Sequence, residues 1–356
     1  MSHVDRLPCA TYPRPDELLS SWLTRLAHDH LLKTHTFGKM LFPGANVWNT
    51  DLDRSAPESM LHTLAQRTGT PLARVEQTVL RRYEGQLHLH SGQGSIAPWV
   101  LPLGIYHRTR RYYGLLFCPN CLRHDGATPY FRTHWRLAIS HVCTRCGVYL
   151  QDRCPGCGQP VTFFRVELGR KSELADKPIS HCFHCGLNLA TVPVEHAPAP
   201  VLADQLELER ILREGWNEQV FYPHLYFVVL RQLVKQLINA RSPSAAFQRA
   251  VDTETGWSLV DEDSSLRKGK TQIEMLPLRI RSEVIRQAQW LLMDWPERLL
   301  RMVRKYPVTS TPFFYGMGDI PFWYHSVIMG NFYVSRYFQA FSAKKISPRL
   351  SEIPGG

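Results

Sequence analysis

The cysteine pattern constrains the fold more than any other feature of the chain. Eight of the nine cysteines occur as four C-x-x-C pairs, and only Cys9 stands alone. Each pair places two thiolates on one tight turn, which is half of a tetrahedral zinc site. Four halves make two complete sites. The pairs are Cys118 with Cys121, Cys143 with Cys146, Cys154 with Cys157, and Cys182 with Cys185.

The way in which the pairs combine decides the architecture. Joining neighbouring pairs leaves connecting segments of 21 and 24 residues, close to the spacing of known zinc sites. An interleaved arrangement needs segments of 32 and 35 residues, and joining the two middle pairs leaves the outer pairs to meet across 60 residues. We therefore predict zinc 1 at Cys118, Cys121, Cys143 and Cys146, and zinc 2 at Cys154, Cys157, Cys182 and Cys185. Residues 147–153 would form a strand-like connector between them.

Both zincs are predicted to be structural, because a closed shell of four thiolates leaves no position for water or substrate. Nearby histidines are alternative ligands, namely His134, His141, His181 and His184. A zinc deaminase needs an H-x-E motif, and the chain has none. The stretch KGKT at 268–271 lacks the first glycine of a phosphate-binding loop, since position 264 is Ser. We therefore expect a protein that is not an enzyme.

The charge of the chain points to a polyanionic partner. Its formal net charge is +11 and its pI is near 9.3, which favours nucleic acid, bound directly or through a complex. The N-terminus shows no apolar signal segment, and the apolar run LYFVVL is far too short to cross a membrane. We expect a soluble, cytoplasmic protein with no membrane partner and with reduced cysteines.

Outside the cysteine region the sequence predicts a mainly α-helical protein with small zinc-ribbon modules. Residues 1–105 would form a helical domain, residues 106–195 a tandem zinc-ribbon region, and residues 196–356 a helical C-terminal domain. Glycines and prolines between 84 and 105, and prolines between 192 and 201, are typical of linkers at these boundaries.

Several segments carry apolar residues at the three- and four-residue spacing of an amphipathic helix. The first follows Pro15 and would have Asp16 and Glu17 in its first turn. In the cysteine region, the alternation of Trp135, Leu137 and Ile139 predicts a strand. The helical segments of the C-terminal part are 201–216, 225–240, 278–293 and 296–305.

Residues 60–82 predict a helix-turn-helix. Ala65 is the small residue needed where two helices touch, Gly69 suits the tight turn, and Val75 would seat the second helix, with Pro71 in its first turn. The second helix would expose side chains suited to groove edges or phosphates. These are Arg74, Gln77, Thr78, Arg81 and Arg82. The same pattern also fits a helical hairpin that docks a protein partner.

An ordered set of motifs resembles the TniQ family, which includes the TnsD-type target selectors of bacterial transposons. The set is PDELLSSWLTRLA near the N-terminus, followed by CPNCL, YFRTHWRL, CTRC and CPGCG, and it covers roughly residues 10–160. Family members often carry C-x-x-H where this chain has Cys143 and Cys146. That departure keeps the metal chemistry.

The resemblance implies a non-catalytic adaptor for transposition. TniQ proteins join a target-recognition device to an AAA+ ATPase that recruits the transposase. In CRISPR-associated transposons the device is the RNA-guided Cascade ribonucleoprotein, on which TniQ can sit as a dimer. TnsD-type members instead read an attachment site in target DNA directly, and tend to be longer than the 356 residues of this chain. The RNA-guided adaptor is therefore the favoured hypothesis, and a sequence-specific DNA-binding protein is the alternative.

Overall fold

The computed structural model describes residues 6–89, 97–107, 109–165, 178–218, 220–239, 244–258 and 272–332. The KGKT stretch at 268–271 lies outside these residues. The chain divides into two compact units. Unit 1 comprises Met1–Trp216, Phe221–His224 and Gln272–Glu283, and unit 2 comprises Asn217–Val220, Leu225–Thr271 and Val284–Gly356. The three predicted segments 1–105, 106–195 and 196–356 remain a prediction, and residue 195 falls inside unit 1.

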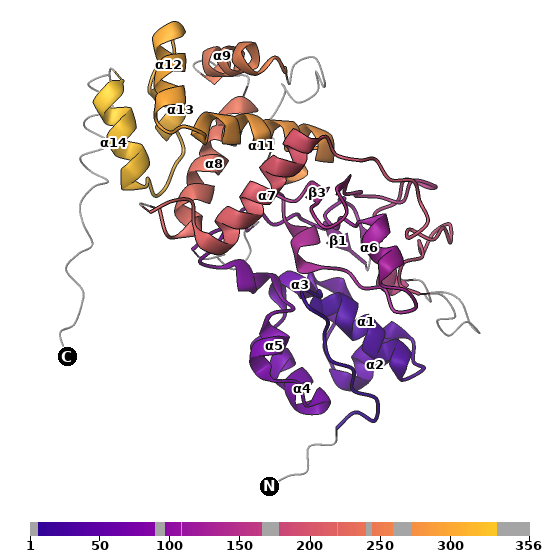
Figure 1. Cartoon of the computed structure of the whole chain (residues 1–356). Coiled ribbons are helices and arrows are strands. Elements are labelled where there is room, and N and C mark those ends of the chain that lie inside the picture. Colours follow the sequence, from indigo (N-terminus) through magenta and orange to yellow (C-terminus); the bar gives the residue numbers. More distant parts are fainter. Residues whose placement is uncertain are drawn as a thin grey trace, which may run out of the picture. The chain divides into compact units, whose positions relative to one another are not determined.

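The described residues are mainly helical, as the sequence predicts (Figure 1). In unit 1 the α-helices are α1 (Leu19–Asp29), α2 (Thr34–Leu41), α3 (Leu52–Ser55), α4 (Glu58–Thr68), α5 (Leu72–Glu76), α6 (Pro119–His124) and α7 (Ala199–Glu214). Short 3₁₀ helices are η1 (Val47–Asn49), η2 (Leu80–Tyr83), η3 (Thr133–Arg136), η4 (Phe163–Arg165) and η6 (Ile273–Met275).

The strands described in unit 1 form two antiparallel ribbons. Strand β1 (Ile105–Tyr106) pairs with β2 (Thr109–Arg110), and β3 (Val142–Cys143) pairs with β4 (Val148–Tyr149). In the second ribbon Cys143 lies opposite Val148, so the ribbon leads directly into a cysteine turn. Each strand has only two residues, and the ribbons position side chains rather than build a sheet core.

The predicted N-terminal helix begins later than its sequence pattern suggests. Helix α1 starts at Leu19, and its apolar residues Trp22, Leu23 and Leu26 are fully buried. The expectation that Asp16 and Glu17 occupy its first turn is wrong. The backbone at Asp16 has a φ of 59°, which is left-handed, and Glu17 pairs with the distant Arg132 in an antiparallel bridge, so the chain forms a turn and a bridge here rather than a helix.

The segment predicted as one helix from 71 to 82 is divided in two. Gly69 ends α4 in the left-handed conformation, with a φ of 69°, and α5 then runs only to Glu76. Thr78 donates its hydroxyl to the Val75 carbonyl at 2.6 Å, and Val79 is extended, with a φ of −106°. Val79 is buried just beyond this turn.

Two segments predicted to be connectors or strands have other roles. Between 97 and 103, where the composition is that of a linker, Trp99 and Leu101 are buried. Leu101 N–H donates to the Arg136 carbonyl at 2.8 Å, and Ala138 N–H to the Trp99 carbonyl at 2.7 Å, so this stretch is core. The strand predicted around Trp135, Leu137 and Ile139 is also wrong. Residues 133–136 form η3, and only a single bridge joins Leu137 to Val100.

The proline-containing stretch 192–201 is fastened to the β3–β4 ribbon. Ala197 N–H donates to the Gly147 carbonyl and Tyr149 N–H to the Glu195 carbonyl, both at 2.9 Å. Val201, at the start of α7, then packs against Val142 and Tyr149. These contacts make the stretch part of unit 1.

The predicted helices of the C-terminal part are present, within two or three residues of their expected ends. Helices α8 (Pro223–Leu237) and α11 (Leu278–Leu292) contribute residues to both units. Unit 2 itself contains α9 (Ser244–Thr255), α12 (Glu297–Lys305), α13 (Thr311–Phe314) and α14 (Phe322–Asn331). In its core the Phe247 and Phe313 rings meet edge to face, with centroids 5.1 Å apart. None of the helices in the described ranges is both long and apolar enough to span a bilayer.

Candidate metal centres

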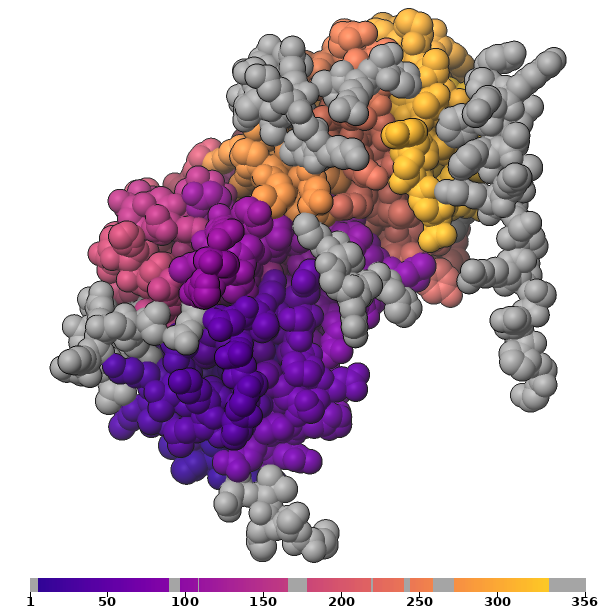
Figure 2. Space-filling view, turned by 180° about the vertical axis from the view of Figure 1, so that it is seen from behind, coloured from indigo at the N-terminus to yellow at the C-terminus, as the bar shows by residue number. Residues whose placement is uncertain are grey.

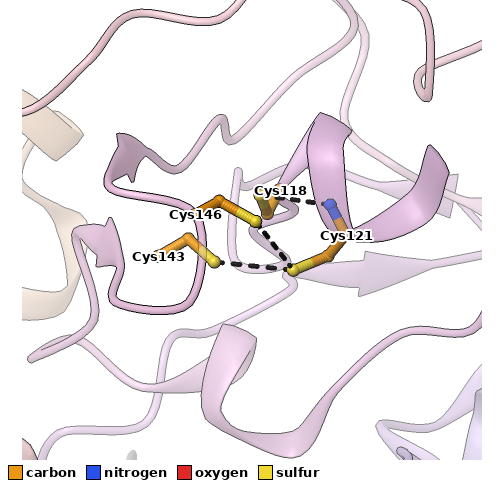
Figure 3. A group of neighbouring side chains, drawn as sticks. All are labelled: Cys118, Cys121, Cys143 and Cys146. Carbon is orange, nitrogen blue, oxygen red and sulfur yellow. Dashed lines mark hydrogen bonds between the residues drawn. The ribbon is translucent and has the colours of Figure 1, made fainter. Parts of the chain in front are cut away.

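Four cysteines from two distant turns meet in the first cluster (Figure 3). Cys118 and Cys121 come from the start of α6, whereas Cys143 and Cys146 come from the β3–β4 turn. The Cys121 Sγ lies 3.5 Å from the Cys143 Sγ and 3.6 Å from the Cys146 Sγ, and all four sulfurs lie within 4.8 Å of one another. A tetrahedral Zn–S bond of about 2.3 Å requires sulfurs about 3.8 Å apart, which this arrangement matches.

Local backbone geometry explains why C-x-x-C can present both sulfurs on one side. After Cys143, the N–H groups of Cys146 and Gly147 both donate to the Cys143 carbonyl, at 3.2 and 2.8 Å. Gly147 closes the turn with a φ of 66°, a conformation that strains other residues. In the other half, Cys118 caps α6, and its sulfur accepts the Cys121 N–H at 3.4 Å.

The second cluster repeats the glycine-closed turn twice. Cys154 and Cys157 meet Cys182 and Cys185, with Sγ separations of 3.6 Å for Cys154 to Cys185 and for Cys157 to Cys182. All four sulfurs lie within 4.8 Å of one another. The glycines that follow, at 158 and 186, have φ values of 71° and 77°. The structure thus joins the four cysteine pairs in chain order. It excludes both the interleaved arrangement and the one that joins the two middle pairs and the two outer pairs.

The chemistry of both clusters fits a metal ion. All eight cysteines are free thiols, and sulfurs 3.5–3.6 Å apart are far beyond the bond length of a disulfide. Each group consists of cysteines alone, so none of the four nearby histidines takes a ligand position. Four converging thiols with no oxygen ligand suit zinc, and the chain can therefore hold two metal ions.

The two clusters differ in burial. In the first, Cys118, Cys121 and Cys143 are buried and Cys146 is half-buried. In the second, Cys185 is exposed and Cys157 is half-buried, while the other two are buried. The Leu187 N–H hydrogen bond lowers the pKa of the exposed Cys185, so the backbone compensates part of the charge that a metal-bound thiolate carries.

A buried arginine accompanies the first cluster. Hydrogen bonds from Cys118 and Cys143 lower the pKa of Cys121, and the positive charge of Arg132 adds to this effect. Asp125 holds the Arg132 guanidinium at 2.8 Å, and the rings of Tyr130 and Trp135 lie 4.1 and 4.7 Å from it. A zinc ion with four thiolates carries a net negative charge, which Arg132 attenuates, although Asp125 offsets part of the positive charge of that arginine.

Helix α7 secures the same cluster from another direction. The Gln205 Oε1 accepts the N–H groups of His141 and Val142, at 3.0 and 3.4 Å, immediately before Cys143. The Thr144 hydroxyl, within the cysteine turn, donates to the Glu209 carboxylate at 3.0 Å. A metal at the first cluster is therefore coupled to a helix that begins 53 residues after Cys146.

Beside the first cluster, the chain forms a set of buried polar contacts that we call the polar lock. It joins residues 14–25 to residues 131–136, and it includes Asp51, Asp53 and Arg82. Leu18 N–H donates to the Phe131 carbonyl at 2.8 Å, and Phe131 N–H to the Ser21 hydroxyl at 3.0 Å. Asp16 accepts hydrogen bonds from Thr133 and His134. Its carboxylate also forms an ion pair with Arg82 at 3.1 Å. Electrostatic attraction to His134, together with the hydrogen bonds from His134 and Thr133, lowers the pKa of Asp16 although its burial acts to raise it.

Two arginines complete the polar lock. Arg25 forms a bidentate ion pair with the buried Glu17. Its guanidinium donates two hydrogen bonds to the carboxylate, both at 2.8 Å. Arg136, whose side chain is fully buried, donates to Asp51 at 2.7 Å and to Asp53 at 3.3 Å. Asp53 also accepts the Ser20 N–H and hydroxyl at 2.8 and 2.9 Å.

The two aspartates beside Arg136 titrate differently. For Asp51, Arg136 outweighs burial and lowers the pKa. For Asp53, burial outweighs the attraction of Arg136, and the pKa is raised. One buried arginine thus fixes one carboxylate as an anion, while its neighbour binds a proton more readily than a free aspartate does.

The residues predicted to contact a groove or partner are partly used within the fold. The prediction that Thr78 is exposed is wrong, since it is only 2% exposed and its hydroxyl bonds to the Val75 carbonyl. Arg82 is paired with Asp16, and it also donates to the Gln77 carbonyl at 3.1 Å.

Arg74 and Arg81 are also engaged within unit 1. Arg74 donates to the Pro13 carbonyl at 2.6 Å and lies over the Tyr12 ring at 5.3 Å. Arg81 donates to the Ala56 carbonyl at 3.2 Å. Arg74 and Gln77 are nevertheless exposed, so of the predicted set these two offer the most accessible side chains.

Sequence reasoning missed the polar lock. Asp16, Glu17, Arg132 and Arg136 all lie in the PDELLSSWLTRLA and YFRTHWRL motifs, which were the available signal. The polar side chains of the family motifs thus serve largely to hold the fold together. Their polar residues hold two segments together that lie more than 100 residues apart. Residues 6–89, in indigo to purple, form a continuous surface in Figure 2.

Comparison with known proteins agrees with these motifs. A search of curated proteins gave no match. Residues 8–150 match the model of the TniQ family, which is associated with transposition and whose members are generally non-catalytic adaptors. The matched segment contains the polar lock and the first cysteine cluster, and it ends directly after β4. The matched segment, residues 8–150, is therefore assigned to the TniQ family.

Proposed function

We propose that the chain is a non-catalytic adaptor that selects the target of DNA transposition. It would join a target-recognition complex to an AAA+ transposition regulator. The family match over residues 8–150 carries this proposal. The family motifs also support it, because their charged side chains form ion pairs within the chain. Examples are Arg25 with Glu17 and Arg136 with Asp51.

The favoured recognition complex is an RNA-guided Cascade ribonucleoprotein of a CRISPR-associated transposon, with the adaptor acting as a homodimer. Three observations support protein docking over groove reading at the α4–α5 hairpin. Thr78 is buried, and Arg82 is held by Asp16. A recognition helix also needs length, and α5 has only five residues. The two metal sites would then serve as rigid supports for docking surfaces.

Direct reading of a DNA attachment site is the second candidate. Arg74 and Gln77 are exposed near the end of α5, and the net charge of +11 favours phosphate contacts. In this hypothesis Arg74→Ala and Gln77→Ala change sequence preference, whereas Arg82→Ala weakens binding to all sequences alike. A control is Gln66→Ala, which alters an exposed residue of α4.

An affinity purification of the tagged full-length protein from its native cells tests the proposal, with RNA, DNA and protein identified together. Recovery of a CRISPR RNA, Cascade subunits and an AAA+ ATPase is the expected result. Recovery of one defined DNA site that survives moderate salt, without guide RNA, would establish the second candidate instead. Purification with neither an AAA+ ATPase nor a targeting component would contradict both.

The α5 variants then locate the contact. If the hairpin docks a protein, Arg74→Ala and Gln77→Ala reduce recovery of Cascade subunits, and Gln66→Ala does not. Loss of transposition with unchanged recovery of every partner would argue against a docking role. Zinc content and thermal unfolding of each variant show that the fold is retained.

A further inference from the structure

Unit 2 contains a cavity of about 420 Å³ between helices α9, α11 and α12. This volume lies in the range of sites that hold small ligands or parts of larger ones. Three cationic side chains and an indole dominate its lining. The lining residues are Glu254, Trp290, Arg298, Arg301, Met302 and Lys305. None of them lies in the TniQ-matched segment 8–150 or in a cysteine cluster.

The acidic groups at this cavity are already neutralised by contacts within the chain. Glu254 accepts hydrogen bonds from the Lys305 ammonium at 2.6 Å and from the Tyr306 hydroxyl at 2.7 Å. Asp294, one turn before Arg298, pairs with that guanidinium at 2.6 Å. Each carboxylate is therefore paired with a cation, which reduces its repulsion of an incoming anion.

Arg301 is the lining cation whose charge is offset only in part, through its attraction to Glu254. Its side chain is exposed, and no salt bridge joins it to any residue in the described ranges. On α12 it lies three residues after Arg298 and four before Lys305, so the three cations share one face of the helix. With Asp294 paired to Arg298 and Glu254 to Lys305, these five groups carry one excess positive charge, which a bound anion would neutralise.

The wall of the cavity is arranged before any ligand arrives. The Arg298 guanidinium lies over the Trp290 ring, 4.9 Å from its centroid, and donates to the Trp290 carbonyl at 3.0 Å. These contacts hold Arg298 in place, with a side chain only 18% exposed. A fixed guanidinium loses little conformational entropy when it contributes to binding an anion.

We propose that this cavity binds a backbone phosphate of a nucleic-acid strand, through Arg301 with Lys305 and Arg298 around it. Arginine presents a fork of N–H donors that matches two oxygens of a phosphate. The net charge of +11 would bring a polyanion to the surface, and the cavity would then fix one phosphate without reading a base. The proposal does not depend on the adaptor function.

Two matched substitutions on α12 test this site in the full-length, zinc-loaded protein. Arg301→Gln removes a charge that lines the cavity, and Arg304→Gln removes an exposed charge of the same helix that does not line it. Fluorescence anisotropy with labelled single-stranded DNA and single-stranded RNA gives the affinity over a range of salt concentrations. Zinc content and the melting temperature of both variants check the fold.

We expect Arg301→Gln to weaken binding roughly tenfold and to reduce the salt slope by about one, with a much smaller effect of Arg304→Gln. Equal loss in both variants would overturn the proposal, because charge alone would then explain binding. No measurable binding of either probe by the unaltered protein would also overturn it. So would equally strong competition by polyglutamate, which would assign the cavity to an acidic peptide. A preference between the two probes identifies which nucleic acid the site takes.

Discussion

The two cysteine clusters are built from the same kind of turn, but their surroundings differ. The first is joined to α7 by hydrogen bonds, lies near Arg132 and is placed beside the polar lock. The second has an exposed ligand in Cys185, and its charge is met mainly by backbone N–H groups such as that of Leu187. The local turn therefore decides where a metal can bind. The tertiary contacts decide how much of the fold depends on that metal.

The largest expected difference concerns loss of one ligand at each cluster. Cys121→Ser should unfold much of unit 1, because a structural zinc contributes on the order of 10 kcal/mol of folding free energy and this one joins α6 to the β3–β4 ribbon. Cys185→Ser should release one zinc and leave most of the fold intact. Circular dichroism and hydrogen exchange distinguish the two. Equal unfolding of the two variants would contradict the proposed difference between the two clusters.

The polar lock should be the next most sensitive feature. Arg136→Met leaves Asp51 and Asp53 buried without their cation, which costs about 3–5 kcal/mol. Chemical denaturation measures this change. Since the second cluster makes no contact with Arg136 in the described residues, zinc should stay bound there in the folded variant. Loss of zinc from the second cluster alone would contradict the proposed independence of that cluster from the polar lock.

Matched glycine substitutions isolate the local turn from its surroundings. Gly147→Ala and Gly158→Ala each force alanine to a φ near 70°, and neither added methyl group meets an atom within 4 Å. Backbone strain alone predicts about 1–2 kcal/mol for each. A melting series should show similar losses in both variants. A much larger loss for Gly147→Ala would show that the first turn has little freedom to adjust under α7.

The smallest effect is a pH dependence within the polar lock. The pKa of Asp16 is lowered below its ordinary value of 3.8, so its contribution is present above that value and is lost as the pH falls through the lowered pKa. Asp16→Asn should therefore cost about 1 kcal/mol at neutral pH and converge with the unaltered protein in acid. Denaturation curves at several pH values measure this. A stability difference that grows in acid would contradict the assignment.

Features set by local sequence were predictable, and features set by distant pairing were not. The spacing of the cysteine pairs predicted both clusters, and apolar periodicity predicted α7, α8, α11 and α12. The family was predicted from an ordered set of motifs, and the match over residues 8–150 confirms it.

Where prediction failed, a contact far along the chain had overridden the local signal. Trp99 lies among glycines and prolines, yet it is buried because its segment pairs with residues 136–138. Asp16 and Glu17 suit a helix start, but His134 and Arg25 engage them in the polar lock. The helix expected over 71–82 ends at Glu76, and the buried Val79 lies beyond it in an extended conformation. None of these partners can be identified from neighbouring residues alone.

The most direct test of the central claim is the zinc count by native mass spectrometry, for the unaltered protein and for Cys154→Ser. Two metal centres joined in chain order predict two zincs per chain, and one in the variant, still held by Cys118, Cys121, Cys143 and Cys146. One zinc in the unaltered protein, or a variant in which Cys118 and Cys121 lose their metal as well, would contradict the account.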